Sequence, residues 1–303
     1  MKDRDEIRKL LDCPVASTPA TFNRDSSIDF DGLRNFIDFT IAGGTTTILL
    51  TYGDSLYSSL TDDEVSEMTR VAVEHTAGRA LVVAADRIWA TPKELEFARH
   101  VREMGADVLM VLPPDWAHSC TVDTLVEHYT AVAEEMPVMV VTNLFMQRQE
   151  AGLKVLERLA GEAPNVVAVK DDVCGKFARK MSLAIYDRMA IISGGQKQNH
   201  LDLLPYGCDG YLSTFIKFKP EITQAYWQAA GAEDWNRVRE IIQTQDMPYF
   251  DYIMGVQGGF NAGLHGTMEL FGVAQRWRRK PYYSLNDEEM EQLAGFLKGQ
   301  GLL

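Results

Sequence analysis

The residue with the clearest chemical potential is Lys170, which follows the apolar run 166–169 and precedes two aspartates. Side chains alternate along a strand, so Val166, Ala168 and Lys170 share one face of the predicted strand. If that face lines the interior of a barrel, the lysine lies in an apolar tube above a small alanine. Burial disfavours the ammonium form, and a neutral amine can attack a carbonyl carbon to form an imine. The alternative is that Lys170 leaves the strand end for solvent or pairs with an acid.

A second group of polar residues ends the apolar run 45–51. Thr51 can donate a hydrogen bond, and a turn through Gly53 can present backbone N–H groups to a small carboxylate. Tyr52 lies between them and carries a phenol. In the alternative interpretation, Thr51 and Tyr52 merely finish a strand.

Thr142 and Asn143 end a third apolar run, which begins at Pro137. A threonine hydroxyl can position a water molecule or a carboxylate, but it is a far weaker acid than a phenol and a poor general acid or base. We therefore expect proton transfer to use Thr142 with an ordered water molecule, or the phenol of Tyr52. Asn143 is a candidate contact for the substrate.

Small and polar residues also end the runs 189–193 and 210–214. Gly194 is expected to leave room for a substrate beside the lysine, with Ser213 and Thr214 as candidate contacts. Barrels often bind phosphate near strands seven and eight. The second run, however, ends without the glycines that let a backbone approach a phosphate closely.

The remaining reactive residue types predict neither a metal site nor a disulfide scaffold. The segment 118–120 (His-Ser-Cys) lacks further ligands at a recognisable spacing. The four cysteines lie far apart without a C-x-x-C pair. The charged N-terminus is not followed by the apolar stretch of a signal peptide, and no run of roughly 20 apolar residues occurs. We expect a soluble, cytoplasmic protein.

Composition excludes several classes of partner. The 303 residues are 46% apolar and 24% charged, as in ordinary globular proteins. With 30 basic and 43 acidic residues, the net charge of −13 repels nucleic acid and anionic membrane surfaces. The one basic run, 276–280, is interpreted as the last turn of a helix that Pro281 ends.

These candidate residues end short apolar runs that alternate with segments of helical period. In segments such as 65–73 and 95–104, apolar residues recur every three or four positions, as a helix with one buried face requires. Eight repeats of strand and helix predict a parallel (β/α)8 barrel over residues 1–230, with the active site at the carboxyl ends of the strands. The eight apolar runs are 14–18, 45–51, 80–85, 107–113, 137–143, 166–170, 189–193 and 210–214.

The alternation stops near Gly231, and residues 231–303 are predicted to form a C-terminal helical domain. Helical patterns cover 235–245, 249–254, 260–277 and 287–298, and no strand-like run separates them. No strand precedes the glycines between residues 255 and 263. We therefore interpret them as a bend between helices rather than as a phosphate loop.

The chain resembles the dihydrodipicolinate synthase / N-acetylneuraminate lyase family of pyruvate-dependent class I aldolases. The resemblance implies a (β/α)8 barrel with a C-terminal helical bundle, assembled as a homotetramer or homodimer. It also implies a Schiff-base lysine at Lys170, a small 2-oxo acid as substrate and no cofactor. The matching segments are Val15–Pro19, Ala42–Gly44, Leu60–Glu64, Met104–Val108, Pro137–Val140, Val169–Asp172, Ser193–Gly195, Arg279–Leu285 and Gly301–Leu303.

The departures from the family pattern lie at positions that move protons and select substrates. Thr142-Asn143 stands where members usually carry Tyr-Asn, and segment 50–54 replaces the usual Gly-Thr-Thr-Gly-Glu. Segment 113–116 lacks the Pro-Tyr-Tyr of dihydrodipicolinate synthases, and Gln147 occupies the place of an arginine, with Arg148 one residue later. Dihydrodipicolinate synthase activity is therefore not expected.

The sequence instead predicts another aldolase or dehydratase that acts on pyruvate or a keto-deoxy sugar acid. In this hypothesis Lys170 forms the imine and Thr51 with neighbouring N–H groups binds the substrate carboxylate. One alternative is a 2-oxo-acid-binding protein of the same fold that has lost its proton relay. Another is a barrel enzyme that binds phosphosugars and forms no imine.

Overall fold

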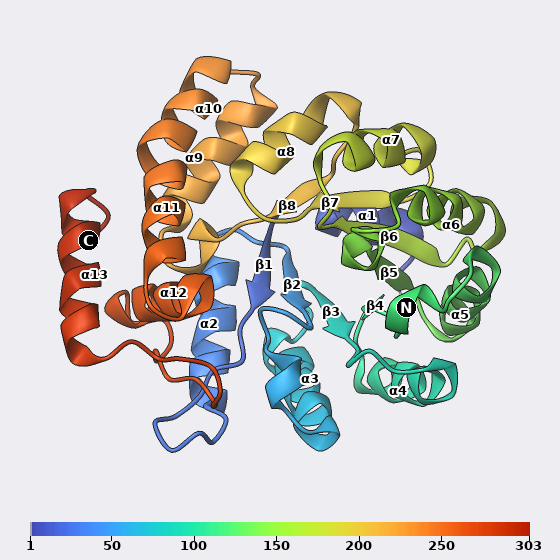
Figure 1. The fold of residues 1–303 in the computed structure, drawn as a ribbon, viewed down its shortest axis with the longest axis horizontal. Helices are drawn as coiled ribbons and strands as arrows, with labels where there is room; N and C mark the ends of the chain where they lie inside the picture. The colour runs from blue at the N-terminus through green and yellow to red at the C-terminus, as the bar shows by residue number, and fades with distance from the viewer. Residues whose placement is uncertain (1) are drawn as a thin grey trace.

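The computed structural model describes residues 2–303 and contains eight parallel strands that close into a barrel in chain order (Figure 1). Each strand pairs with the next, and β8 pairs with β1 to complete the barrel. This confirms the predicted fold class. The strands are β1 (Pro14–Thr18), β2 (Thr47–Leu50), β3 (Leu81–Ala85), β4 (Val108–Val111), β5 (Val138–Val141), β6 (Val166–Asp171), β7 (Ala190–Ser193) and β8 (Gly210–Leu212).

Helices surround the barrel and bury the outer faces of the strands (Figure 1). Strands covered on both faces read as continuous apolar runs, which explains the pattern in the sequence. The barrel helices are α2 (Phe30–Ala42), α3 (Asp62–Thr76), α4 (Thr91–Met104), α5 (Val122–Glu135), α6 (Gln149–Glu162), α7 (Gly175–Ile185), α8 (Lys197–Leu203) and α9 (Pro220–Gly231). Among residues 2–303, no helix combines the length and apolar character that a membrane span requires.

Local signals define where these helices begin and end. Thr61 caps α3 in a capping box with Glu64, whose carboxylate accepts a hydrogen bond from the backbone N–H of Thr61. Gly105 ends α4 with φ of 96°, a left-handed conformation that glycine adopts without strain. An additional helix, α1 (Arg4–Leu11), packs at the amino ends of the strands, where the carbonyl of Leu10 accepts hydrogen bonds from Thr46 and Thr47.

The C-terminal extension is helical, as predicted, but one of its helices is shorter than expected. It contains α10 (Trp235–Ile241), a π-helical turn (Ile242–Asp246), α11 (Met247–Gly255), α12 (Gly259–Leu270) and α13 (Asp287–Gly299). The prediction that segment 276–280 forms the last turn of a helix is wrong. Helix α12 ends at Leu270, and Gly272 then adopts φ of +70°. Two of the basic residues beyond it pair with acids instead: Arg276 pairs with Glu269 and Asp287, and Arg279 pairs with Glu64 at 2.8 Å.

The extension packs against the barrel rather than forming a separate core. Tyr249 of α11 contacts Phe215 and Phe218, which follow β8, at ring-centroid distances of 5.1 and 4.9 Å. One hydrophobic cluster contains buried residues of both parts. Figure 1 shows α11, α12 and α13 along one side of the barrel, with the C-terminus on the outermost helix. The division into a domain of residues 1–230 and a domain of residues 231–303 remains a prediction. Its boundary lies at the end of α9.

Candidate active site

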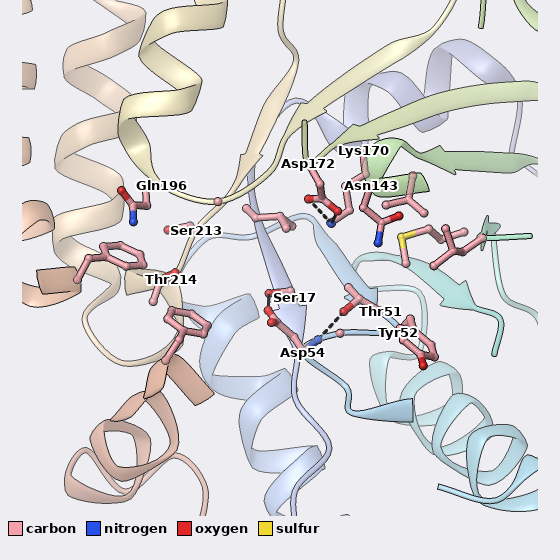
Figure 2. Close-up of a pocket in the computed structure, with 18 of the residues that line it drawn as sticks. Ser17, Thr51, Tyr52, Asp54, Asn143, Lys170, Asp172, Gln196, Ser213 and Thr214 are labelled. Atoms are coloured by element: carbon pink, nitrogen blue, oxygen red, sulfur yellow. Dashed lines mark hydrogen bonds and ion pairs between the residues drawn. The ribbon is translucent and has the colours of Figure 1, made fainter. Parts of the chain in front are cut away.

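A cavity of about 400 Å³ opens at the carboxyl ends of the strands (Figure 2). Seven of the sequence-predicted site residues line it, and two, Thr142 and Gly194, do not. The seven are Thr51, Tyr52, Gly53, Asn143, Lys170, Ser213 and Thr214. Helices α11 and α12 supply part of the opposite wall through Phe250, Met254 and Phe260.

Lys170 lies on β6, where it pairs with Val141 of β5 and Ile192 of β7. Only 7% of the residue is exposed, and its side chain reaches into the cavity (Figure 2). Its Nζ lies 2.5 Å from Oδ1 of Asp172 and also contacts Oδ2. The lysine is therefore buried in the barrel, where its amine contacts the side chain of Asp172.

The turn after β6 holds Asp172 against the lysine. The hydroxyl of Thr142 donates to Oδ1 of Asp171 at 2.9 Å and accepts the backbone N–H of Asp172 at 2.8 Å. The Asp171 carboxylate in turn accepts the backbone N–H groups of Val173 and Cys174, and burial raises its pKa above the usual value. The hydroxyl of Thr142 therefore stabilises the turn after β6, outside the cavity lining, and these hydrogen bonds already occupy it.

Gly194 provides room for Asp172 rather than for a substrate. A Cβ at this position would collide with the carboxylate of Asp172 and the backbone carbonyl of Asp171. Gly195, the next residue, is the one that lines the cavity. The expected role of Gly194 is therefore corrected, because the space beside it is occupied by protein.

The turn after β2 contributes Thr51, Tyr52 and Gly53 to the cavity lining. Oγ1 of Thr51 accepts the backbone N–H of Asp54 at 2.9 Å, which leaves the hydroxyl hydrogen available to a ligand. Within residues 2–303, the backbone N–H groups of Tyr52 and Gly53 also have no hydrogen-bond partner. Hydroxyl and backbone N–H groups that converge in a turn are suited to holding a small anion.

An ion pair between a buried lysine and a partly exposed aspartate lies beside this turn. Oδ2 of Asp54 is 3.0 Å from Nζ of Lys217 and 2.5 Å from Oγ of Ser17. Burial alone would raise the pKa of Asp54, but Lys217, Ser17 and Lys170 together hold it below the usual value. Asp54 is therefore a carboxylate, and Lys217 neutralises it from behind the cavity wall.

Tyr52 and Asn143 lie at the edge of the cavity with side chains available to solvent or ligand. Figure 2 shows the phenol of Tyr52 pointing away from Lys170, which separates the hydroxyl from Nζ of Lys170 in this structure. Asn143 is exposed and points toward the cavity beside Lys170. Oγ of Ser213 is engaged with Oγ1 of Thr223 at 2.9 Å.

The charges around the cavity come in local pairs. Asp172 faces Lys170, and Asp54 faces Lys217. Arg148, near the position of the family arginine, is turned away and binds Asp115 at 2.6 Å. In the part of the chain that the structure describes, no group of three or more His, Cys, Asp or Glu side chains is placed to hold a metal ion.

Sequence reasoning missed several residues of the site, and one of them had a usable signal. Lys170 and Asp172 are two residues apart, so the alternation that places the lysine inside the barrel also places Asp172 there. No comparable signal existed for Lys217 or Phe250. They reach the site from segments far along the chain from the lysine.

Comparisons with known proteins agree with this architecture. The model of the dihydrodipicolinate synthetase family matches residues 14–300. A 4-hydroxy-tetrahydrodipicolinate synthase of Aquifex aeolicus is 27% identical over 72% of this chain and 74% of its own length. A protein of Pseudomonas fluorescens, named Probable 5-dehydro-4-deoxyglucarate dehydratase, is 26% identical over 98% of both chains. The crystal structure of dihydrodipicolinate synthase from Oceanobacillus iheyensis shares the fold, with a TM-score of 0.84, 19% identity and coverage of 99% and 100%.

Proposed function

The chain belongs to the dihydrodipicolinate synthetase family, and we propose that its Lys170 forms the imine with the 2-oxo acid on which it acts. The protein is a Schiff-base-forming lyase of the class I aldolase type. We propose that the imine serves as the electron sink for cleavage of a carbon–carbon or carbon–oxygen bond. The observation that carries the assignment is the buried amine of Lys170 at the carboxyl end of β6, inside the cavity.

Asp172 is the proposed proton-transfer group. As a carboxylate 2.5 Å from Nζ of Lys170, it can take a proton from the ammonium and release the neutral amine. After the amine adds to C2, the same acid can return this proton to the former carbonyl oxygen. It can then move a second proton from the carbinolamine nitrogen to the resulting hydroxyl, which leaves as water and yields the protonated imine. This role makes neither Thr142 nor Tyr52 necessary for imine formation.

The turn after β2 is proposed to hold the substrate carboxylate. The Thr51 hydroxyl and the backbone N–H groups of Tyr52 and Gly53 are three donors in this turn that no acceptor of the described residues engages, so they can bind one end of the substrate. Lys217 screens the nearby Asp54 and so limits its repulsion of the incoming anion. Asn143 and Ser213 are proposed to contact the rest of the substrate.

Borohydride trapping tests the assignment of Lys170. Incubation with pyruvate and borohydride is expected to add the mass of pyruvate less one oxygen atom to the peptide that contains Lys170. The Lys170→Met variant should gain no mass, whereas Lys176→Met, which changes a lysine on the neighbouring helix, should still be labelled. Absence of the increment from the wild-type protein, across a panel of 2-oxo acids, would reject the proposal.

A turnover assay distinguishes the proposed lyase from a 2-oxo-acid-binding protein that retains the lysine but has no activity. Release of pyruvate from 4-hydroxy-2-oxo acids, or loss of water from them, is expected with the wild-type chain. Trapping and ligand-induced thermal stabilisation without any turnover would instead favour the binding protein.

We propose a homodimer or homotetramer as the assembled form. Two loops at the carboxyl end of the barrel expose Trp116 and Met146, at 88% and 56%. The ion pair between Asp115 and Arg148 ties these loops together, so the two apolar side chains belong to one supported surface. Apolar side chains this exposed often mark protein–protein contacts.

A cytoplasmic location is proposed from the cysteines. All four cysteines are free thiols in the structure. Free thiols persist in the reducing cytosol and are uncommon in secreted proteins.

A further inference from the structure

The half of the cavity opposite Lys170 differs from the half that holds the imine. Figure 2 shows Lys170 and Asn143 on one side, and Gln196, Ser213 and Thr214 on the other, next to the C-terminal helices. These helices contribute Phe250, Met254 and Phe260 to the lining. The extension therefore adds an apolar far wall, lined by Phe250, Met254 and Phe260, to the side of the cavity opposite the amine of Lys170. The polar side chains of Gln196, Ser213 and Thr214 lie on the same side as this wall.

The apolar wall is held in place by packing within the extension. The rings of Phe250 and Phe260 stack with centroids 5.9 Å apart and planes 3° apart. Helices α11 and α12 pack closely, because Gly263 leaves no room for a side chain next to Ile253. A wall whose side chains already contact each other requires little ordering when a ligand binds.

The charges of the cavity do not accommodate a second substrate carboxylate. Within residues 2–303, Lys170 is the one cationic side chain that lines the cavity, and it is the imine-forming residue. Asp54 and Asp172 also line it and are anions. Lys217 and Arg148 already face Asp54 and Asp115. A second carboxylate near Phe250 would lose hydration without gaining a cation.

We infer that the substrate is a 2-oxo acid with a single carboxylate and an apolar aliphatic or aromatic group beyond C4. This inference rests on the proposed function, because it assumes the imine on Lys170. The apolar group lies against Phe250, Met254 and Phe260, and Gln196 or Thr214 binds a hydroxyl on the connecting carbon. A cavity of about 400 Å³ is larger than pyruvate alone requires and is within the range of small-ligand sites.

Two acids of matched shape test the inference. 2-Oxoglutarate and 5-methyl-2-oxohexanoate differ at the far end, where a carboxylate replaces an isopropyl group. Each condenses with the Lys170 amine with loss of water, and borohydride then delivers hydride to the imine carbon. The half-saturating concentration for labelling of the full-length protein is measured for each acid. It is expected to be lower for 5-methyl-2-oxohexanoate by about tenfold or more, the contribution of one or two buried methyl groups.

Two variants show whether the far wall carries this preference. Met254→Lys adds a cation at a position that is 61% exposed, and it should reduce or reverse the preference. Met247→Lys changes an exposed methionine on the same helix that does not line the cavity, and it should leave the preference unchanged.

The possible failures are distinguishable. If neither pyruvate nor any other 2-oxo acid of the panel labels Lys170, the proposed function fails. If pyruvate labels Lys170 but the wild type takes 2-oxoglutarate as well as or better than its apolar counterpart, or takes neither, the inference about substrate class is overturned and the function stands.

Discussion

Asp172 lies within proton-transfer distance of the reacting amine, and substitution separates its chemistry from substrate binding. Asp172→Asn keeps the size of the side chain but removes the base, so the rate of imine formation is expected to fall by about a hundredfold or more. KM should change little, because Thr51 and its neighbouring N–H groups hold the carboxylate. Rapid-mixing measurement of imine formation with pyruvate checks this.

Two further variants serve as controls for the Asp172→Asn measurement. Asp172→Glu retains a carboxylate and should recover part of the rate. Asp202→Asn changes a half-exposed aspartate that pairs with Arg179, and it should behave as the wild type. A rate within twofold of wild type in Asp172→Asn would exclude the proposed role.

A buried pair of carboxyl groups, Asp86 and Glu94, makes the free energy of unfolding depend on pH. Burial raises the pKa of Asp86 to about 7, and burial together with Asp86 raises the pKa of Glu94 well above its usual range. Between about pH 4 and about pH 7, the folded protein keeps a proton on Asp86 that the unfolded chain has released. The contribution of the pair to stability is therefore present at low pH and is lost as the pH rises.

Glu94→Gln should weaken this dependence, because the variant lacks the Glu94 carboxyl group, whose own pKa is raised by burial and by Asp86. We expect the loss of unfolding free energy between about pH 5 and about pH 8 to be smaller in the variant, by about 2 kcal/mol. Urea unfolding at both pH values measures it. Burial lowers the pKa of His128 to about 4, which acts in the opposite direction, but this contribution is common to both proteins and cancels. Equal losses in the two proteins would contradict the prediction.

At the scale of elements, a buried ion pair joins the barrel to the extension. Nζ of Lys197, in the first turn of α8, lies 2.8 Å from Oδ1 of Asp246, and both side chains are at most 2% exposed. Asp246 ends the π-helical turn that leads into α11, the helix that carries Phe250. The pair therefore connects the loop after β7 to the apolar wall of the cavity.

Breaking this pair on one side should cost more than removing it completely. Asp246→Leu leaves a buried ammonium without a partner and is expected to lower the free energy of unfolding by about 3–5 kcal/mol. The double variant Lys197→Met with Asp246→Leu should be much closer to wild type, because an apolar pair needs no compensating charge. Denaturant midpoints of the single and double variants measure the coupling. Additive losses in the double variant would show that the two charges do not depend on each other.

At the scale of the whole molecule, the exposed side chain of Trp116 tests the proposed assembly. We expect the wild type to sediment as a dimer or tetramer, and Trp116→Asp to shift it toward smaller species by placing a charge in an apolar contact. Leu183→Asp provides the comparison, since Leu183 is also largely exposed but lies on α7. A wild-type monomer, or a Trp116→Asp variant that sediments as the wild type does, would overturn the proposal.

The sequence by itself determined the barrel, the place of Lys170 on β6 and the turn after β2. Each of these depends on local patterns, because side-chain alternation and helix caps extend over only a few residues. Seven of the eight predicted runs contain an observed strand in full, and β6 extends one residue beyond its run. Lys170 is buried on the face that its alternation with Ala168 predicts. Even Asp172 follows the same alternation.

Only the tertiary structure decided which groups surround the lysine. Lys217 and Asp54 are 163 positions apart in the chain, and no local pattern relates them. The same is true of Phe250, which enters the site through the packing of α11 against the segment after β8. The charges that face the substrate and the apolar wall both depend on contacts between residues far apart in the chain. Burial of apolar surface between helices and strands stabilises these contacts, so the sequence pattern within a single element does not reveal them.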